Sequence, residues 1–265
     1  MGVASAEREM TESDWHGYTK QAFKLDEHPC FVVAPTIAAP GKPWVWRTSF
    51  PEFHSEIDRE LLRLGWHVGF IGVVDMLGCD AALDLMDRFY DVLLSEWGLA
   101  HRPALEAVSR GGLHAYRYAA RRPGRVACIY ADTPVMDLKS WPVKCHDGEA
   151  QVEDAIKHYG FEDHAALTAY RENPMDLLAV IAEAGIPLRH LVSLNDEVVP
   201  PQENTLEAQR RLQAMGHDME VVTVATGTPE SKGHHFPLAY VFESARFIAR
   251  HSYVLPEAKE YYALR

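Results

Sequence analysis

Short apolar runs alternate along the chain with segments whose apolar positions recur every three or four residues. The second pattern predicts amphipathic helices that begin at Ser55 and end at Gly65, and that cover roughly 80–98, 110–121, 202–215 and 237–250. The apolar runs between them predict strands, several of which are apolar on both sides, as parallel strands usually are. We expect these strands at 30–34, 43–50, 66–74, 103–108, 125–131, 187–194 and 219–225.

This alternation predicts an α/β fold with a mainly parallel, doubly wound sheet and helices on both faces. The 265 residues suit a single domain, 1–265. Residues 1 to about 25 are polar and predict an arm or a first edge strand. Residues 137–185 break the rhythm, and we interpret them as a small helical cap inserted over the carboxyl ends of the strands, where such sheets bind ligands. An ordinary long crossover is the alternative.

Composition narrows the classes of partner. Apolar residues make up 47% of the chain and charged residues 24%, as in ordinary globular domains. The formal net charge of -12 disfavours a nucleic-acid partner, because a phosphate backbone would be repelled. No apolar stretch approaches the length of about 18 residues that crosses a membrane, and the N-terminus shows no secretory signal. We expect no membrane partner and a cytoplasmic location by default, with secretion as the alternative if a signal peptide has been removed. The sequence does not predict an oligomeric state.

Four cysteines stand far apart and form no CxxC pair: Cys30, Cys79, Cys128 and Cys145. Cys128 lies in an apolar run, so a buried free thiol is the expected role. A structural zinc site is not expected, because the ligand spacing is absent.

Ser109 stands where the strand 103–108 ends and a helix begins at once. Such a turn is the setting of a nucleophile elbow, which exposes the serine hydroxyl and needs small residues two positions before and two after it. Those positions hold Ala107 and Gly111, with Gly112 next, whereas the usual pattern has glycine at the first of them. Taken alone, a serine that caps a helix explains the same pattern.

Two later segments supply partners for a reactive serine. Asp196 follows the strand 187–194, and we take it as the carboxylate that orients a general base, with the adjacent Glu197 as the fallback. Asp132, which ends the strand 125–131, is a rival acid. The loop before the last helix carries His234 and His235; either could take the proton of the nucleophile, and we favour His234 because it follows a glycine directly. No metal is expected at this histidine pair, since further ligands are missing at a fitting spacing.

An oxyanion formed at Ser109 needs hydrogen-bond donors. The first is expected from the main-chain N–H of Arg110, the residue after the nucleophile. The second is expected from the loop after the strand 43–50, where the candidates are Arg47, Thr48 and Ser49.

The substrate pocket has four candidate residues. Trp141 lies in the predicted cap, and its aromatic face suits a sugar ring. Met76 follows a predicted strand, while His235 and Asp132 lie beside the proposed triad. Trp44 and Trp46 alternate along one strand, and core packing explains them better.

Several motifs together resemble a known family. The matching stretches are Trp15-His-Gly-Tyr, Gly41-Lys-Pro-Trp-Val-Trp-Arg47, Ser109-Arg-Gly-Gly112, Ala127-Cys-Ile-Tyr-Ala-Asp132, Lys139-Ser-Trp-Pro142, Asp196-Glu-Val-Val-Pro with Glu203-Asn-Thr, and Gly233-His-His235. The order serine, acid, histidine is that of the α/β-hydrolase fold. The chain resembles a bacterial group of α/β hydrolases related to carbohydrate acetylesterases, including the xyloglucan-acetylesterase type.

That resemblance implies a triad of Ser109, Asp196 and His234 and the hydrolysis of esters without a metal or organic cofactor. Members of the group have Gly-His-His-Pro-His where this chain has Gly-His-His-Phe-Pro, a local departure that leaves the substrate open.

The expected function is a serine-dependent carboxylic ester hydrolase that works through an acyl-enzyme, with a carbohydrate acetylesterase as the leading expectation. The partner is then a small-molecule or carbohydrate ester. A lactonase, a dienelactone-type hydrolase or a peptidase would use the same triad. A non-catalytic binding protein is the remaining alternative, because fold alone does not prove activity.

Overall fold

A nine-stranded sheet forms the centre of the molecule in the computed structural model, which describes residues 9–145 and 149–252. The strand order is β1-β2-β3-β5-β4-β6-β7-β8-β9; β1, β2 and β3 run antiparallel to their neighbours, and the strands from β5 to β9 are parallel. The bounds are β1 (Thr11–Trp15), β2 (Tyr18–Leu25), β3 (His28–Ala34), β4 (Trp44–Arg47), β5 (His67–Ile71), β6 (Ala104–Val108), β7 (Cys128–Asp132), β8 (Leu188–Ser193) and β9 (Met219–Val224).

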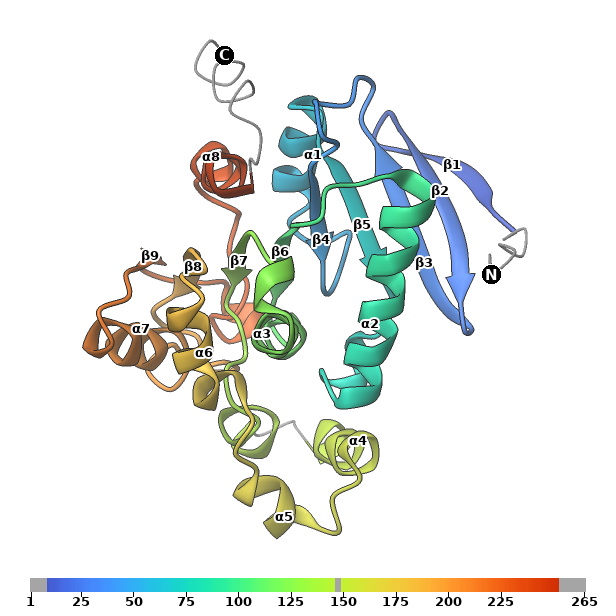
Figure 1. The fold of residues 1–265 in the computed structure, drawn as a ribbon. Coiled ribbons are helices and arrows are strands. Elements are labelled where there is room, and N and C mark those ends of the chain that lie inside the picture. The colour runs from blue at the N-terminus through green and yellow to red at the C-terminus, as the bar shows by residue number, and fades with distance from the viewer. Residues whose placement is uncertain (1–8, 146–148, 253–265) are drawn as a thin grey trace.

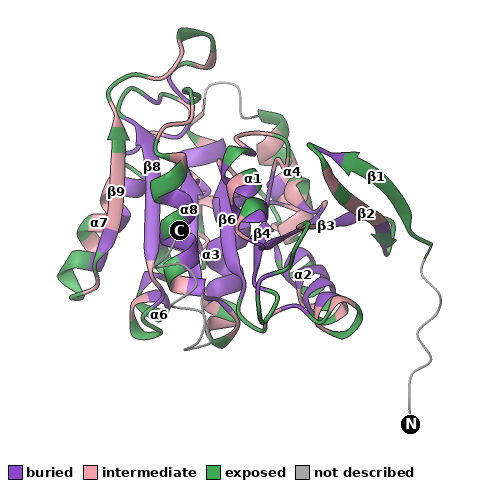
Figure 2. Ribbon diagram, turned by 90° about the horizontal axis from the view of Figure 1, so that it is seen from above, coloured by how far each residue is buried: buried purple, intermediate pink, exposed green. Residues whose placement is uncertain are grey.

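Helices cover both faces of this sheet (Figure 1), so the prediction of a mainly parallel, doubly wound α/β fold is confirmed. One face carries α1 (Glu56–Arg63) and α8 (Val241–Ser252), which pack against each other. The other carries α2 (Asp80–Val92), α3 (Gly111–Arg121), α6 (Leu178–Glu183) and α7 (Thr205–Ala214). Each face has its own apolar cluster, and every residue of β5, β6, β7 and β8 is buried. Figure 2 shows this buried centre between the more exposed edges at β9 and at β1 and β2.

The N-terminal segment differs from its prediction. Instead of an arm or a single edge strand, it forms the antiparallel hairpin of β1 and β2. His16 and Gly17 make the turn with φ of 52° and 86°, the left-handed conformation that suits a two-residue hairpin. Residues 1–8 of the predicted arm lie outside the described residues.

Other boundaries shift by a few residues. The strand predicted at 43–50 leaves the sheet after Arg47, so that 48–50 form a loop at its carboxyl end. The helix predicted at 80–98 ends as α2 at Val92 and continues as a π-helical turn, Leu93–Trp97. Gly98 closes that turn with a φ of 64°.

Short helices follow β7, at the lower end of the molecule in Figure 1. They are η4 (Lys139–Val143), α4 (Glu149–Tyr159), α5 (His164–Ala169) and η5 (Pro174–Asp176). These helices share an apolar cluster with residues of the main domain, among them Leu77, Leu113 and Val199. We call residues 137–176 the cap segment, because α6 already packs on α3 and α7 as part of the main helical layer. Residues 146–148 of the predicted cap lie outside the described part.

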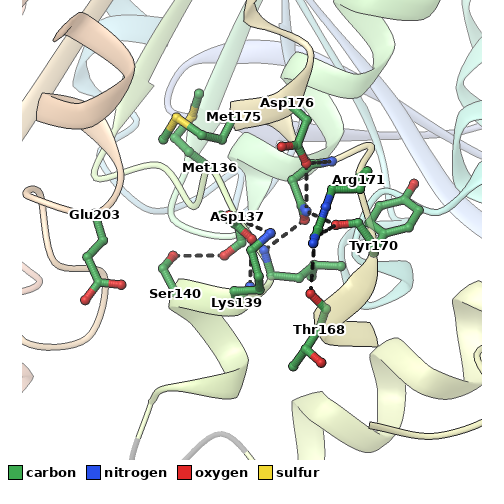
Figure 3. A network of polar contacts seen from close by, with 12 residues as sticks. Met136, Asp137, Lys139, Ser140, Thr168, Tyr170, Arg171, Met175, Asp176 and Glu203 are labelled. Atoms are coloured by element: carbon green, nitrogen blue, oxygen red, sulfur yellow. Dashed lines mark hydrogen bonds and ion pairs between the residues drawn. The ribbon is translucent and has the colours of Figure 1, made fainter. Parts of the chain in front are cut away.

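Polar contacts hold the cap segment together (Figure 3). The Asn173 amide oxygen accepts the N–H of Leu138 at 3.0 Å, which joins the two ends of the segment. The Ser140 hydroxyl donates to the main-chain oxygen of Asp137 and contacts Asn204 Oδ1, ahead of α7, at 2.8 and 2.9 Å. The cap segment is therefore fixed to the main domain at its start.

The described residues contain no helix long and apolar enough to span a membrane. They also contain no group of three or more His, Cys, Asp or Glu residues arranged to hold a metal ion. All four cysteines carry free thiols, and Cys128 is buried, as predicted.

Candidate active site

Ser109 lies between β6 and α3 with a φ of 53°. A residue with a side chain seldom adopts this left-handed conformation, and such strain persists only where the surroundings hold it in place. Here the Ser109 N–H donates to the main-chain oxygen of Asp132 at 2.9 Å, and the Ser109 carbonyl accepts the N–H of Val135 at 2.9 Å. The turn is thus tied to the exit of the neighbouring strand β7.

Both glycines after the serine are required by close packing. A Cβ at Gly111 would lie 2.1 Å from Ser49 Oγ, and a Cβ at Gly112 would lie 2.6 Å from the main-chain oxygen of Val135. Ala107, two residues before the serine, is fully buried in β6. The turn therefore has the tight geometry of a nucleophile elbow, with small residues on both sides.

Three side chains that are distant in sequence meet above the strand ends. The Ser109 Oγ lies 2.9 Å from Nε2 of His234, and the His234 Nδ1 lies 2.7 Å from Oδ2 of Asp196. Asp196 and His234 are buried, with 4% and 6% of their surfaces exposed. In such a chain the imidazole can accept the serine proton at Nε2 while Nδ1–H donates to the carboxylate.

The second oxygen of Asp196 is also occupied. Its Oδ1 accepts the N–H groups of Val198 and Val199 at 2.9 and 2.8 Å. These donors fix the carboxylate plane, so that Oδ2 points at the imidazole. The adjacent Glu197 is exposed and does not take part in this arrangement.

Solved structures of three hydrolases resemble the chain. An S-formylglutathione hydrolase from Agrobacterium tumefaciens matches at 16% identity with a TM-score of 0.57, over 91% of this chain and 95% of its own. An acylaminoacyl peptidase from Pyrococcus horikoshii matches at 14% identity with a TM-score of 0.64, over 97% of this chain. An acylaminoacyl peptidase in complex with Z-Gly-Gly-Phe-chloromethyl ketone matches at 13% identity with a TM-score of 0.58, over 90% of this chain. The chain spans 44% of the length of each peptidase.

The chain has the α/β-hydrolase fold. At these identities the likeness shows the fold alone. No protein-family model matches the chain, and neither does any curated protein. The finer resemblance to acetylesterases of the xyloglucan type is not shown by these comparisons.

The loop after β4 meets the elbow at Ser49 and Phe50. The N–H of Thr48 donates to the Glu106 main-chain oxygen at 2.9 Å, and its hydroxyl contacts the Gly111 oxygen at 3.1 Å. The Ser49 hydroxyl is bonded to the main chain of Val108. Among the described residues, no acceptor binds the N–H of Ser49, of Phe50 or of Arg110, so the prediction of Ser49 as a donor stays open. The prediction of Arg47 or Thr48 as a donor is therefore wrong, because both are committed to the sheet and its surroundings.

Arg47 was predicted beside the oxyanion, but its side chain lies in the interior between two carboxylates. Its guanidinium is fully buried, with Nη1 2.8 Å from Glu106 Oε1 and 3.2 Å from Asp58 Oδ2. Its Nη2 donates to the main-chain oxygens of Phe50 and Phe53, each at 2.5 Å. Burial raises the pKa of both carboxyls, against the opposing effect of the guanidinium. Through these two hydrogen bonds, the buried guanidinium of Arg47 fixes the main chain of the loop 50–53.

Asp132 is neither the triad acid nor a residue that faces the pocket. Its carboxylate is 2% exposed and lies 2.5 Å, through Oδ2, from Nδ1 of His54. The other ring nitrogen of His54 lies 2.9 Å from the main-chain oxygen of Phe236. The interpretation of Asp132 as a substrate contact is corrected by this second Asp–His pair.

The other predicted pocket residues differ in exposure. Trp141 is 9% exposed and packs in the apolar cluster of the cap segment, which leaves little of its ring for a substrate. Met76 is half-buried against the main core. His235 is exposed, with its ring 4.8 Å from that of Phe53. Of these, His235 has the surface that a substrate could touch.

Phe50 and His54 were missed in the sequence. Phe50 has a φ of 41° and His54 a φ of 54°, and the guanidinium of Arg110 lies 5.3 Å from the centre of the Phe50 ring. A left-handed conformation is usually predicted from a glycine in the sequence, and neither position has one. The available signal was position alone, since both residues follow the strand whose end borders the elbow.

Proposed function

We propose that this chain is a serine hydrolase that cleaves carboxylic esters through an acyl-enzyme, with Ser109, His234 and Asp196 as its triad. The observation that carries the proposal is the hydrogen-bonded sequence Asp196–His234–Ser109 built on a strained elbow. Metal-free hydrolysis needs a nucleophile, a base and a group that orients the base, and these three side chains supply them.

In the proposed mechanism, His234 Nε2 takes the proton of the Ser109 hydroxyl as Oγ attacks the ester carbonyl. The oxyanion accepts hydrogen bonds from the N–H groups of Arg110 and Phe50, which have no acceptor among the described residues. The bond to the alkoxy group breaks, and the imidazolium returns its proton to the leaving alcohol. Water then attacks the acyl-enzyme and gives a proton to His234. The bond between the acyl group and Ser109 Oγ breaks, the imidazolium returns that proton to Oγ, and the acid product leaves.

The substrate class that we propose is an acetylated carbohydrate. The support is the sequence resemblance to carbohydrate acetylesterases, together with the exposed ring of His235 and the half-buried ring of Phe53 beside the triad. Aromatic faces of this kind suit the apolar faces of sugar rings.

The first test is turnover of p-nitrophenyl acetate by the wild type and by Ser109→Ala. Ser109→Ala should reduce turnover to the level of the buffer, and a fluorophosphonate probe should label the wild type but not the variant. Undiminished turnover in the variant would refute the role of Ser109. A panel of acetylated xylan, lactones and peptide amides then tests the substrate class; preference for lactones or amides would contradict it.

A further inference from the structure

Two Asp–His pairs flank the loop that carries the proposed base. Asp196 contacts His234 at Nδ1, and Asp132 contacts His54, whose Nε2 reaches Phe236, two residues after His234. We propose that His54, with Asp132, is a positioning residue that holds the His234 loop against the elbow. This inference rests on the proposed hydrolase function.

The hydrogens of the second pair follow from its partners. A carbonyl oxygen only accepts, so the His54 Nε2 that lies 2.9 Å from Phe236 O must carry a hydrogen. The 2.5 Å contact between His54 Nδ1 and Asp132 Oδ2 requires a second hydrogen between these atoms. A neutral imidazole beside a carboxylate has one hydrogen for two acceptors. The two contacts together therefore need a hydrogen on each ring nitrogen of His54.

The loop depends on this contact on its C-terminal side. Before the base, main-chain bonds from Gly233 to Thr228 and from His234 to Ser231 fix the chain. After it, the main chain of His235 bonds Thr228 and Ser231 within the same loop, and the Phe236 carbonyl that follows has His54 as its partner among the described residues. No regular element follows until α8 begins at Val241. The bonds of His235 stay within the loop, so the contact with His54 is the one that ties Phe236 to the segment after β4.

Asp132 links the same contact to the nucleophile. Its main-chain oxygen accepts the Ser109 N–H at 2.9 Å, while its carboxylate holds His54. The Asp132 Oδ1 is buried without a hydrogen-bond partner among the described residues, so the carboxylate relies on His54. One residue therefore fixes the elbow through its main chain and the base through its side chain, which sets their separation.

The test compares His54→Gln, Asp132→Leu and the double variant with His217→Ala. His217 is a suitable control because it also contacts a main-chain oxygen, that of Ile186 at 3.0 Å, at a place outside the site. Glutamine at position 54 carries both of its hydrogens on one nitrogen, so it cannot donate to Asp132 and Phe236 from opposite sides as the imidazole does. Leucine at position 132 has nearly the shape of aspartate but leaves His54 Nδ1 without its acceptor. In both single variants kcat should fall about 10- to 100-fold, the range known for hydrogen-bond partners that orient metal ligands, with KM little changed. The double variant should lose no more than either single one, because the pair acts as a unit.

A second measurement does not depend on catalysis, and its first part needs only the wild-type protein. Proton NMR should show two strongly downfield N–H resonances, one from each Asp–His pair. His54→Gln should remove one of them, and His234→Gln the other. A single resonance in the wild type, unchanged kcat in the folded variants or additive losses would overturn the role of His54. Absence of wild-type turnover with both resonances present would instead refute the hydrolase function.

Discussion

A Cβ atom at Gly111 would lie 2.1 Å from Oγ and 2.8 Å from Cβ of Ser49. Ser49 cannot give way easily, because its hydroxyl bonds the main chain of Val108 at 2.8 and 3.1 Å. The absence of a side chain at Gly111 therefore allows the loop after β4 to lie against the elbow. This contact brings the Phe50 segment close to Ser109.

Gly111→Ala should impair turnover more than stability. Overpacking of this kind costs about 1–3 kcal/mol of unfolding free energy. A displacement of about 1 Å at the nucleophile costs roughly 100-fold in rate. Urea unfolding and kcat for an acetyl ester measure the two effects. The matched control is Gly124→Ala, since a Cβ there meets no atom within 4 Å; wild-type kcat in Gly111→Ala would contradict the argument.

Asp196→Asn should reduce kcat by about 10⁴-fold, the size known for the same change in a serine protease triad. The two oxygens of Asp196 accept hydrogens from His234, Val198 and Val199. An asparagine must turn its NH₂ group toward one of these donors, which selects the wrong histidine tautomer or breaks the main-chain contacts. Steady-state kinetics on an acetyl ester measure the loss.

Glu197→Gln is the matched control for that change, because Glu197 is the neighbouring acid and is exposed. It should retain wild-type kcat. A larger loss in Glu197→Gln than in Asp196→Asn would exchange the roles of the two acids.

The residues of the proposed triad could be placed together from the sequence because each stands at the end of a predicted strand or in the loop beyond one. Parallel strands bring their carboxyl ends to one edge, so that Ser109, Asp196 and His234 had to lie near each other. Chain order then indicated their roles. Strand ends and chain order can both be read from the sequence without knowing where any side chain points.

Arg47 and His54 could not be assigned in the same way. Arg47 ends a strand as Asp132 does, yet its guanidinium turns inward to two carboxylates. Its direction depends on Asp58 in α1 and Glu106 in β6, which come together only in the folded chain. The chain brings His54 to its partner with left-handed φ values at Phe50 and at His54 itself. Residues other than glycine seldom adopt such values, so the sequence does not predict them.

Arg47→Met should be strongly destabilising at neutral pH. The change leaves Glu106 and Asp58 buried without their cation, and breaking a buried ion pair costs about 3–5 kcal/mol. The pKa of each carboxyl in the native state would rise further above its unfolded value. Such acids destabilise the fold above the unfolded pKa, so the loss should shrink as the pH is lowered toward the raised pKa.

Urea unfolding of Arg47→Met at pH 7 and at pH 5 measures that difference. Arg59→Met is the control, because Arg59 is half-exposed and pairs with Glu56 at 3.8 Å. It should shift the unfolding free energy by less than about 1 kcal/mol. Equal destabilisation by Arg47→Met at both pH values would contradict the account of the buried carboxyls.

Two buried histidines should make the protein sensitive to acid. Burial lowers the pKa of His114 to about 4 and that of His190 to about 3, from a usual value of 6.5. Below pH 6.5 the unfolded chain binds protons that the native state does not, so stability is complete above this pH and falls as the pH decreases. Each such histidine contributes a slope of about 1.4 kcal/mol per pH unit between about pH 6 and the lowered pKa.

His190→Gln should therefore flatten the pH dependence of unfolding, even though it lowers stability at neutral pH. That loss arises because His190 contacts the Tyr116 hydroxyl at 2.6 Å and Thr205 Oγ1 at 2.9 Å, both in the buried core. The measurement is the free energy of urea unfolding at intervals from pH 7.5 to pH 4.5. His101→Gln, at an exposed position, controls for the loss of an imidazole. An unchanged slope in His190→Gln would mean that His190 takes up its proton while the protein is still folded.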